Sequence, residues 1–356
     1  MWSDTKLTEL LGIKYPIIQG GMAGRIASPE RLVAAVSNAG GLGTLGAGYM
    51  SPDQIRSTIK YIRTLTDKPF AVNLFAPDSY EVNNEDVARM NNLLRPYYEE
   101  LGIESQPLPA KFSESFAEQL AVILEENVPI FSFTFGVPAK EHIQQLKNKG
   151  IFTIGTATTV KEGMYLEESG IDMIVGQGSE AGGHRGTFMG SYQDGLIGTM
   201  ALIPQLADAV HIPVIAAGGI MDHRGLIASL ALGAAGIQMG TAFLTCAECG
   251  AHHLYKQTVL GSAAEDTAIT TAFSGKAARG LKNRFMVEMQ AHASAILPYP
   301  VQNALTKNMR SAAENQNQTE FMSLWAGQGS SLSKTWSVSE FIAELIKNTN
   351  EKMGAQ

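Results

Sequence analysis

The sequence predicts an α/β protein folded as a (β/α)8 barrel, the TIM barrel, with a small, mostly helical second domain. Eight short apolar runs alternate along the chain with segments that carry helix start signals. Nearly continuous apolar runs are typical of parallel strands that are buried on both faces. Eight such units fit a closed barrel better than an open, doubly wound sheet. The predicted strands are 15–19, 42–45, 70–74, 129–133, 151–154, 171–175, 213–217 and 236–239.

Helix start signals follow several of these strands. Ser28 before Pro29 predicts an N-cap with proline at the first helical position. Two capping boxes predict that further helices begin after Ser51 and after Thr159. Other helices are expected over about 114–126, from Asp222 onward, and over Ser337 to Asn348.

Two stretches depart from the alternation. Residues 78–112 are polar and contain Pro96, Pro107 and Pro109, and residues 246–325 are irregular and mostly helical in pattern. We expect these two stretches to form the second domain, which would cover the active site. The barrel would then consist of residues 1–77, 113–245 and 326–356.

Composition and charge narrow the class of protein. The chain has 356 residues, and 27 Lys and Arg against 34 Asp and Glu give a net charge of −7, which offers no electrostatic basis for binding nucleic acid or an anionic membrane. The run from Leu226 to Leu244 is uncharged, but its glycines and its pattern predict a helix, a turn and a strand rather than a membrane span. The first residues lack the features of a signal peptide, and two cysteines do not suggest a disulfide scaffold. We expect a cytoplasmic protein.

The segment Gly176–Phe188 is the strongest candidate for the chemical centre. It follows a buried strand and contains five glycines between positions 176 and 186, which let the backbone approach a flat or charged group. It also contains His184, whose side chain type titrates nearest to physiological pH. His184 is therefore the candidate acid or base, while Arg185 could hold an anion or could equally be solvated.

The seventh and eighth predicted strands end in small residues. Gly218 and Gly219 follow one strand, and Gln238, Met239, Gly240 and Thr241 end the other. Barrels commonly build a phosphate site from backbone N–H groups at these two positions. The two turns together predict a phosphate-bearing cofactor, although either turn alone could simply need small residues.

Two carboxamides stand at other strand ends. Asn73 ends the third strand and Gln177 follows the sixth. Amides can supply both donors and acceptors to the edge of a heteroaromatic ring. Asn and Gln are also ordinary turn residues.

Two further motifs are given structural interpretations. Gly41 to Gly46 matches the dinucleotide fingerprint, but a helix precedes it and its glycines lie in the next strand, which argues against a Rossmann site. Cys246, Cys249, His252 and His253 have spacing like that of metal ligands. We interpret them as ordinary helix residues, because a structural zinc site needs four well-placed ligands. No metal site is predicted.

Taken together, the chain resembles the nitronate monooxygenase family, formerly called 2-nitropropane dioxygenases. The resemblance runs through residues 15–300 and is closest to the FMN-dependent group with a Gly-Gly-His-Arg-Gly motif, here Gly182 to Gly186. Gly21 departs from the proline or alanine common in relatives. The matching pieces are 19–24, 37–43, 135–138, 155–158, 177–188, 216–220, 238–243 and 273–276.

The resemblance implies a function and assigns roles to residues. It implies a TIM barrel that binds FMN without a covalent link and oxidises alkyl nitronates, above all the toxic anion propionate 3-nitronate, with O₂. The reaction would pass through a flavin semiquinone and give a carbonyl compound and nitrite or nitrate. By this resemblance His184 is the active-site histidine, acting either as a base or as a cationic anchor. The residues expected to contact FMN are Asn73, Gln177, Gly182, Gly219, Gln238, Met239, Gly240 and Thr241, with Met22 and Ala23 also near the ring.

Alternatives remain open at this point. An FMN-dependent enoyl-acyl-carrier-protein reductase or an NAD(P)H:quinone reductase would resemble this chain in the barrel. A regulatory barrel that binds flavin or metal without turnover is the alternative from another class. Assembly into a homo-oligomer is left open.

Overall fold

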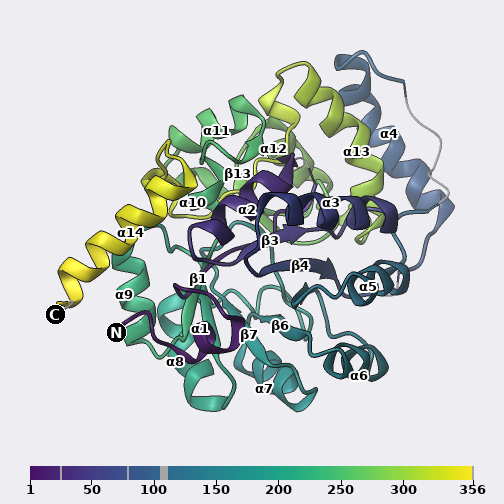
Figure 1. The fold of residues 1–356 in the computed structure, drawn as a ribbon. Helices are drawn as coiled ribbons and strands as arrows, with labels where there is room; N and C mark the ends of the chain where they lie inside the picture. The colour runs from purple at the N-terminus through teal and green to yellow at the C-terminus, as the bar shows by residue number, and fades with distance from the viewer. Residues whose placement is uncertain (25, 78–79, 105–110, 355–356) are drawn as a thin grey trace.

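The centre of the molecule is a barrel of eight parallel strands. The computed structural model describes residues 1–24, 26–77, 80–104 and 111–354. The strand order is β1-β10-β9-β7-β6-β5-β4-β3, and a parallel bridge between Ile18 and Leu42 joins β1 to β3 and closes the sheet. Figure 1 labels β1, β3, β4, β6 and β7 of this sheet. All eight predicted strands are present. They are β1 (Ile17–Gln19), β3 (Gly43–Gly46), β4 (Phe70–Phe75), β5 (Ile130–Thr134), β6 (Phe152–Ala157), β7 (Met173–Gln177), β9 (Val214–Ala217) and β10 (Gly236–Met239).

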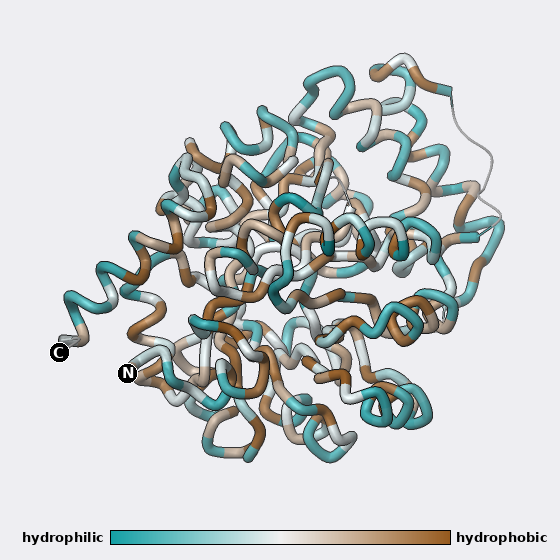
Figure 2. Tube along the Cα trace, viewed as in Figure 1, coloured by the Kyte–Doolittle hydropathy of each residue, from teal (hydrophilic) through white to brown (hydrophobic). Residues whose placement is uncertain are grey.

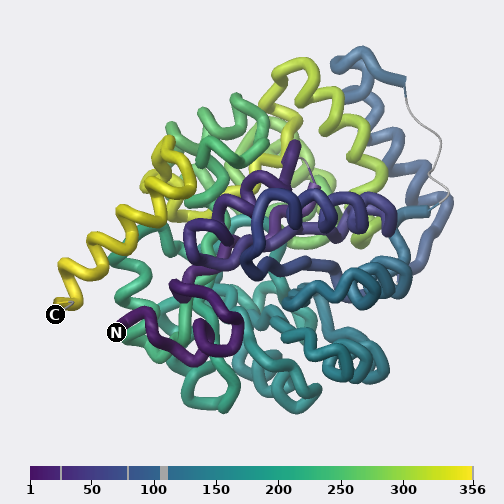
Figure 3. Tube along the Cα trace, viewed as in Figure 1, coloured from purple at the N-terminus to yellow at the C-terminus, as the bar shows by residue number. Residues whose placement is uncertain are grey.

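Helices surround the barrel, as the repeated winding of the chain in Figure 3 shows. The last helix in the sequence completes the ring by packing against α9 and α2. The predicted (β/α)8 fold is thus confirmed. The surrounding helices are α2 (Pro29–Asn38), α3 (Pro52–Leu65), α5 (Phe116–Glu125), α6 (Lys140–Asn148), α7 (Val160–Glu168), α8 (Thr199–Ala209), α9 (His223–Ala231) and α14 (Val338–Met353).

The predicted helix starts are correct, but one of them lacks the expected side-chain cap. Ser51 and Thr159 form capping boxes, and Asp222 accepts a hydrogen bond from the backbone N–H of Arg224. Ser28 precedes α2 as expected, but its side chain makes no capping hydrogen bond because its backbone is left-handed, with φ 49°. Proline at the first position therefore begins this helix without the serine cap that the sequence suggested.

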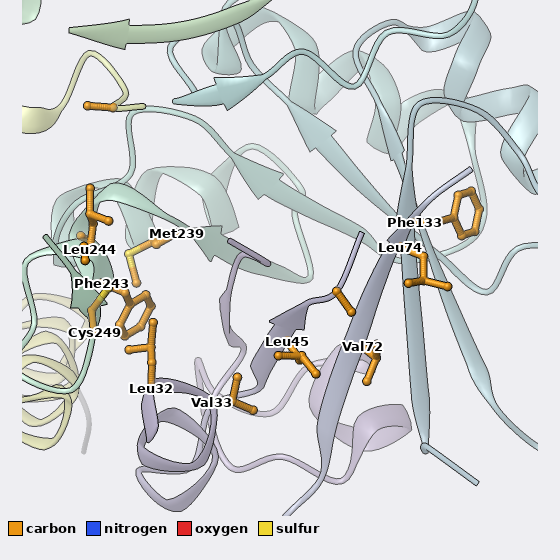
Figure 4. Close-up of a cluster of buried hydrophobic side chains, with 14 of the residues drawn as sticks. Leu32, Val33, Leu45, Val72, Leu74, Phe133, Met239, Phe243, Leu244 and Cys249 are labelled. Carbon is orange, nitrogen blue, oxygen red and sulfur yellow. The ribbon is translucent and has the colours of Figure 1, made fainter. Parts of the chain in front are cut away.

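The core has two layers. Inside the barrel, alternate strand residues such as Ile18, Ile154 and Ile215 pack together, and α1 (Lys6–Leu11) closes the amino-terminal end with Leu7 and Leu11. The other strand residues face outward against the helices. Figure 4 shows this outer layer where α2 packs on the sheet, and Figure 2 shows apolar residues concentrated at the centre of the molecule. Strands buried on both faces explain the continuous apolar runs in the sequence.

Residues 80–104 and 246–325 contribute side chains to the cavity at the carboxyl ends of the strands. The phenol of Tyr98 in α4 donates to the carbonyl of Leu305 in α13 at 2.6 Å, so the two segments pack together. Pro96 lies inside α4, whereas Pro107 and Pro109 lie outside the described residues. That these segments form a separate domain stays a prediction. Their elements are α4 (Asn84–Glu100), β11 (Gly250–Ala251), α11 (His253–Leu260), η1 (Ala264–Asp266), β12 (Thr267–Thr270), β13 (Ala278–Leu281), α12 (Arg284–Met289), η2 (Gln290–Ala295), α13 (Val301–Asn315) and η3 (Thr319–Phe321).

Small elements link these segments to the barrel. β2 (Ile26–Ala27) pairs with β11, and β8 (Gly183–His184) pairs with β13. The short helix α10 (Thr241–Leu244) follows β10, and η4 (Ser330–Leu332) precedes α14. The uncharged run from Leu226 to Leu244 contains the end of α9, a turn and β10, as predicted, and ends in the short helix α10, which was not predicted. Among the described residues, no helix has both the length and the apolar character needed to cross a membrane.

Candidate active site

A cavity of about 830 Å³ lies at the carboxyl ends of the barrel strands, and residues of α4 and α13 also line it. Barrel enzymes place their active sites at this end. All the site residues predicted from the sequence line this cavity. They are Asn73, Gln177, Gly182, His184, Gly219, Gln238, Met239, Gly240 and Thr241, together with Met22 and Ala23.

His184 is held at the cavity wall by a strand that the sequence did not predict. The expected glycine loop contains β8, and His184 pairs with Ala278 of β13. Its Nε2 lies 2.8 Å from the hydroxyl of Ser274. The imidazole therefore has a fixed position, set by residues nearly a hundred positions away in the sequence.

Aromatic rings and positive charges surround this imidazole. The ring centroids of Trp325 and Phe135 lie 5.4 and 5.6 Å from that of His184. Burial, and then the positive charges of Lys276 and Arg310, lower the pKa of His184 to about 3. Because both effects disfavour the imidazolium, His184 is neutral at physiological pH and still faces the cavity.

Arg185 is not a solvated residue, so that interpretation of it was wrong, and its guanidinium binds backbone carbonyls. Its side chain is 1% exposed, and its guanidinium donates to the carbonyls of Gln177, Gly178 and Gly195 at 2.6 to 3.0 Å. Burial, and then the nearby charge of Arg279, lower the pKa of Arg185 to about 10. Arg185 thus links the backbone at Gln177 and Gly178, where the glycine loop begins, to the backbone at Gly195, which follows the loop.

The amides of Gln177 and Asn73 also make contacts within the protein. Gln177 donates to the carbonyl of His184 at 3.0 Å and accepts from the N–H of Gly186 at 2.9 Å. Asn73 donates to the hydroxyl of Ser132 at 2.8 Å. Gln177 therefore braces the loop that carries His184, while the Asn73 amide has further capacity to bind a ligand.

The carboxylates of Glu162 and Glu180 hold the two ends of the glycine loop in place through hydrogen bonds. Glu162 is fully buried and accepts hydrogen bonds from the N–H groups of Phe188 and Met189 at 2.6 and 2.9 Å. Glu180 accepts from the backbone and the hydroxyl of Thr199, both at 2.9 Å. Sequence reasoning identified Glu162 only as a helix cap, because its contacts with the loop depend on the tertiary fold.

The turns after β9 and β10 offer backbone donors to the cavity. In the described part of the chain, the N–H groups of Gly219, Gly240 and Thr241 have no hydrogen-bond acceptor. A Cβ on Gly240 would meet nothing within 4 Å, so this glycine faces open space. The hydroxyl of Thr241 accepts from the N–H of Gly327, which brings the segment after Trp325 to the same place. Such a cluster of donors suits an anion such as a phosphate.

Several residues around His184 were missed or given no role in the sequence analysis. Ser274 and Lys276 belong to a matching piece of the family pattern, and Tyr299 was not noticed. Arg310 and Trp325, which line the cavity, were not noticed either. Lys276 lies 4.6 Å from the Phe135 ring, and burial raises the pKa of Tyr299. They come from the irregular region 246–325, where no strand pattern indicates which residues face the barrel.

The cysteine and histidine cluster does not form a metal site in the described structure. Both Cys246 and Cys249 are buried free thiols, and burial raises the pKa of each, that of Cys246 to about 12. Among the described residues, no group of three or more potential ligands could hold a metal ion. The interpretation of the cluster as helix residues is wrong for three of its members. Cys246 and Cys249 lie in the turn between α10 and β11, and His252 is the N-cap of α11, so only His253 is helical.

Comparison with known proteins agrees with this geometry. The family model described as nitronate monooxygenase matches residues 4–348. A protein of Staphylococcus saprophyticus described as a "probable nitronate monooxygenase" is 48% identical over 352 residues, which are 98% of this chain and 99% of that protein.

Two solved structures are similar throughout. A nitroalkane oxidase from Streptomyces ansochromogenes has a TM-score of 0.89 and 38% identity, and covers 98% of this chain and 99% of its own. FabK from Thermotoga maritima has a TM-score of 0.77 and 31% identity, with coverage of 99% and 97%. The family match, the full-length identity and the shared barrel lead to one conclusion: this chain is an oxidoreductase that belongs to the nitronate monooxygenase family.

Proposed function

We propose that this enzyme oxidises alkyl nitronates with O₂, using FMN that is bound without a covalent link. Propionate 3-nitronate is the proposed physiological substrate, and a carbonyl compound and nitrite or nitrate are the proposed products. The observation that carries the proposal is a cavity lined by His184, by Arg310 and by backbone donors, with the charge of Lys276 close enough to act on His184.

The cavity fits FMN on two grounds. Its volume of about 830 Å³ is within the range of cofactor sites. The unpaired N–H groups of Gly219, Gly240 and Thr241 would receive the phosphate, and the open space in front of Gly240 leaves room for it. Asn73 and Gly182 would lie near the ring, and Gln177 would hold the loop against it. FMN, when bound there, would supply the redox chemistry.

The residues around His184 would bind and orient the substrate. Lys276 and Arg310 bring positive charge to the cavity, which attracts an anionic nitronate. Phe135, Tyr299 and Trp325 surround the imidazole with ring surface. Because His184 is uncharged at physiological pH, the attraction comes from the lysine and the arginine, and the histidine is available as a base or a hydrogen-bond partner.

A second candidate function is reduction by NAD(P)H, as in an enoyl-acyl-carrier-protein reductase or a quinone reductase. The likeness to FabK at 31% identity favours keeping this candidate. A regulatory barrel without turnover has less support, because the described residues contain no potential metal cluster. A cytoplasmic location and the oligomeric state stay predictions.

One experiment separates these functions. The purified enzyme is mixed without oxygen with propionate 3-nitronate and, separately, with NADH or NADPH, and the flavin spectrum is followed. We expect the nitronate to change the spectrum rapidly and the nicotinamides to leave it unchanged. Rapid bleaching by NADH with no response to the nitronate would establish the reductase instead. A folded preparation without FMN would overturn both.

A further inference from the structure

The hydroxyl of Ser274 is the hydrogen-bond partner of the His184 imidazole. Ser274 lies in the turn before β13, and the pairing of His184 with Ala278 brings this turn beside the imidazole. The Ser274 side chain is 1% exposed. Its oxygen lies 2.8 Å from Nε2 of His184, 3.0 Å from the carbonyl oxygen of Lys276 and 3.3 Å from the backbone nitrogen of Lys276.

The proton on this hydroxyl can be assigned from its neighbours. The Lys276 carbonyl can only accept, so without the Ser274 proton between them two oxygens would face each other at 3.0 Å. The hydroxyl therefore donates to that carbonyl. Its lone pairs accept from the N–H of Lys276 and from His184, which requires the proton of the neutral imidazole to be on Nε2.

The other imidazole nitrogen is then a base that faces the cavity. Nδ1 of His184 has no hydrogen-bond partner among the described residues and is not among their enclosed, unpaired atoms. His184 lines the cavity beside Phe135 and Trp325. In the Nε2–H tautomer, Nδ1 presents its lone pair at this wall.

We propose that Ser274 is a positioning residue that holds His184 in the Nε2–H tautomer, so that Nδ1 removes the α-proton of a neutral nitroalkane. The α C–H bond breaks, the proton moves to Nδ1, and the electron pair moves into the nitro group to give the nitronate anion. The imidazolium keeps its Nε2–H bond to Ser274. This inference rests on the proposed function, because the nitronate formed in this way is the substrate already proposed.

The charges around the site favour the product of this step. The positive charges of Lys276 and Arg310 help to lower the pKa of His184. The same charges would stabilise a nitronate formed beside the imidazole, and the anion would in turn stabilise the imidazolium. Proton transfer thus produces an ion pair in a site that already contains two cations.

The test compares two substrates that differ by one proton. In Ser274→Ala, we expect kcat/KM for nitroethane to fall roughly tenfold or more, because the imidazolium loses a charge-assisted hydrogen bond. Oxidation of preformed ethyl nitronate should stay within about twofold, because it needs no base. Nitroethane deuterated at its α-carbon should show a primary isotope effect on kcat/KM in this variant. Ser274→Thr keeps the hydroxyl and should restore nitroethane turnover.

Ser37→Ala is the matched control. Ser37 is a buried serine of α2 whose hydroxyl also donates to one backbone carbonyl and accepts from one N–H, but it does not line the cavity. Both activities should be unchanged in this variant. Equal loss of nitroethane and nitronate oxidation in Ser274→Ala, or no loss of either, would overturn the proposal.

The tautomer can also be read directly, without activity. Nitrogen-15 NMR of the wild-type enzyme labelled at histidine, with His184→Gln to assign the signal, should show a protonated Nε2 and an unprotonated Nδ1. A proton on Nδ1 would contradict the proposal even if Ser274→Ala did not fold. If the wild-type enzyme oxidised neither nitroethane nor a nitronate, the proposed function would fail, while the tautomer assignment would still be decided by this spectrum.

Discussion

The guanidinium of Arg185 donates a hydrogen bond of 2.6 Å to the carbonyl of Gly178, seven residues earlier in the chain. It also reaches the carbonyls of Gln177 and Gly195. One buried cation therefore joins three stretches of backbone beneath the loop that carries His184. Its role is to keep the glycine-rich loop in one shape, since glycine itself imposes little restriction on the backbone.

Arg185→Met should destabilise the fold by about 3 kcal/mol, because it leaves buried carbonyl groups without donors. Chemical denaturation monitored by circular dichroism measures this change. Arg224→Met is the control, since Arg224 is 66% exposed and pairs with Asp222 at the surface. It should cost less than about 0.5 kcal/mol. Equal stability of the two variants would show that Arg185 does not hold the loop.

His184 should make stability depend on pH in a defined window. Its pKa in the fold, about 3, is lower than its ordinary value of 6.5. Between these values the unfolded state binds more protons than the folded state, so stability from this residue falls as the pH is lowered from about 6.5 toward 3. In His184→Gln this part of the acid destabilisation should disappear. Denaturation curves at several pH values for the two proteins, compared by difference, would reveal it.

His184→Ala should keep its flavin and lose most of its turnover. The residues expected to hold the cofactor come from other strand ends, whereas His184 faces the substrate region. Loss of a general base typically costs about 10² to 10⁴ in rate. Steady-state oxygen consumption with nitroethane, alongside the flavin-to-protein absorbance ratio, measures both quantities. Unchanged turnover would remove His184 from the mechanism.

Gly240→Ala should weaken FMN binding without harming the apoprotein. The φ of Gly240 is −109°, which alanine adopts readily, and the added methyl group would enter the open space assigned to the phosphate. Titration of the apoprotein with FMN, followed by flavin fluorescence, should show at least about a tenfold weaker affinity, or about 1.4 kcal/mol. The melting temperature of the apoprotein should stay the same.

A glycine outside the cavity supplies the comparison. Gly261 ends α11 with φ −94°, and a Cβ there would meet only the carbonyl of Gln257 at 3.6 Å. Gly261→Ala should bind FMN as the wild-type enzyme does. Normal affinity in Gly240→Ala would place the phosphate elsewhere.

Chelators and thiol reagents should have little effect on the folded enzyme. Cys246 and Cys249 are buried, and their raised pKa values keep them as thiols at physiological pH. We expect EDTA to leave activity and melting temperature unchanged, and a thiol-reactive chromogenic disulfide to react fully only after denaturation. Loss of stoichiometric zinc together with a lower melting temperature would support the metal-binding alternative.

The sequence by itself determined the barrel. Each strand is a continuous apolar run in the sequence, which indicates that it is buried. Ser51, Thr159 and Asp222 each cap a helix through contacts within four residues. Such signals are local, so they can be recognised without knowing the fold. The same logic located His184 and the turns at Gly219 and Gly240, because active sites of barrels lie at the carboxyl ends of the strands.

Only the tertiary structure decided what surrounds these residues. Ser274, Trp325 and Arg310 come to His184 from a region with no regular pattern, across at least 90 positions of sequence. Arg185 looks like an exposed cation in the sequence, yet the fold buries it against carbonyl groups. Hydrogen bonding and burial between distant segments leave no local trace in composition or periodicity. For this reason the position of the candidate catalyst could be predicted, whereas its protonation and its hydrogen-bond partner could not.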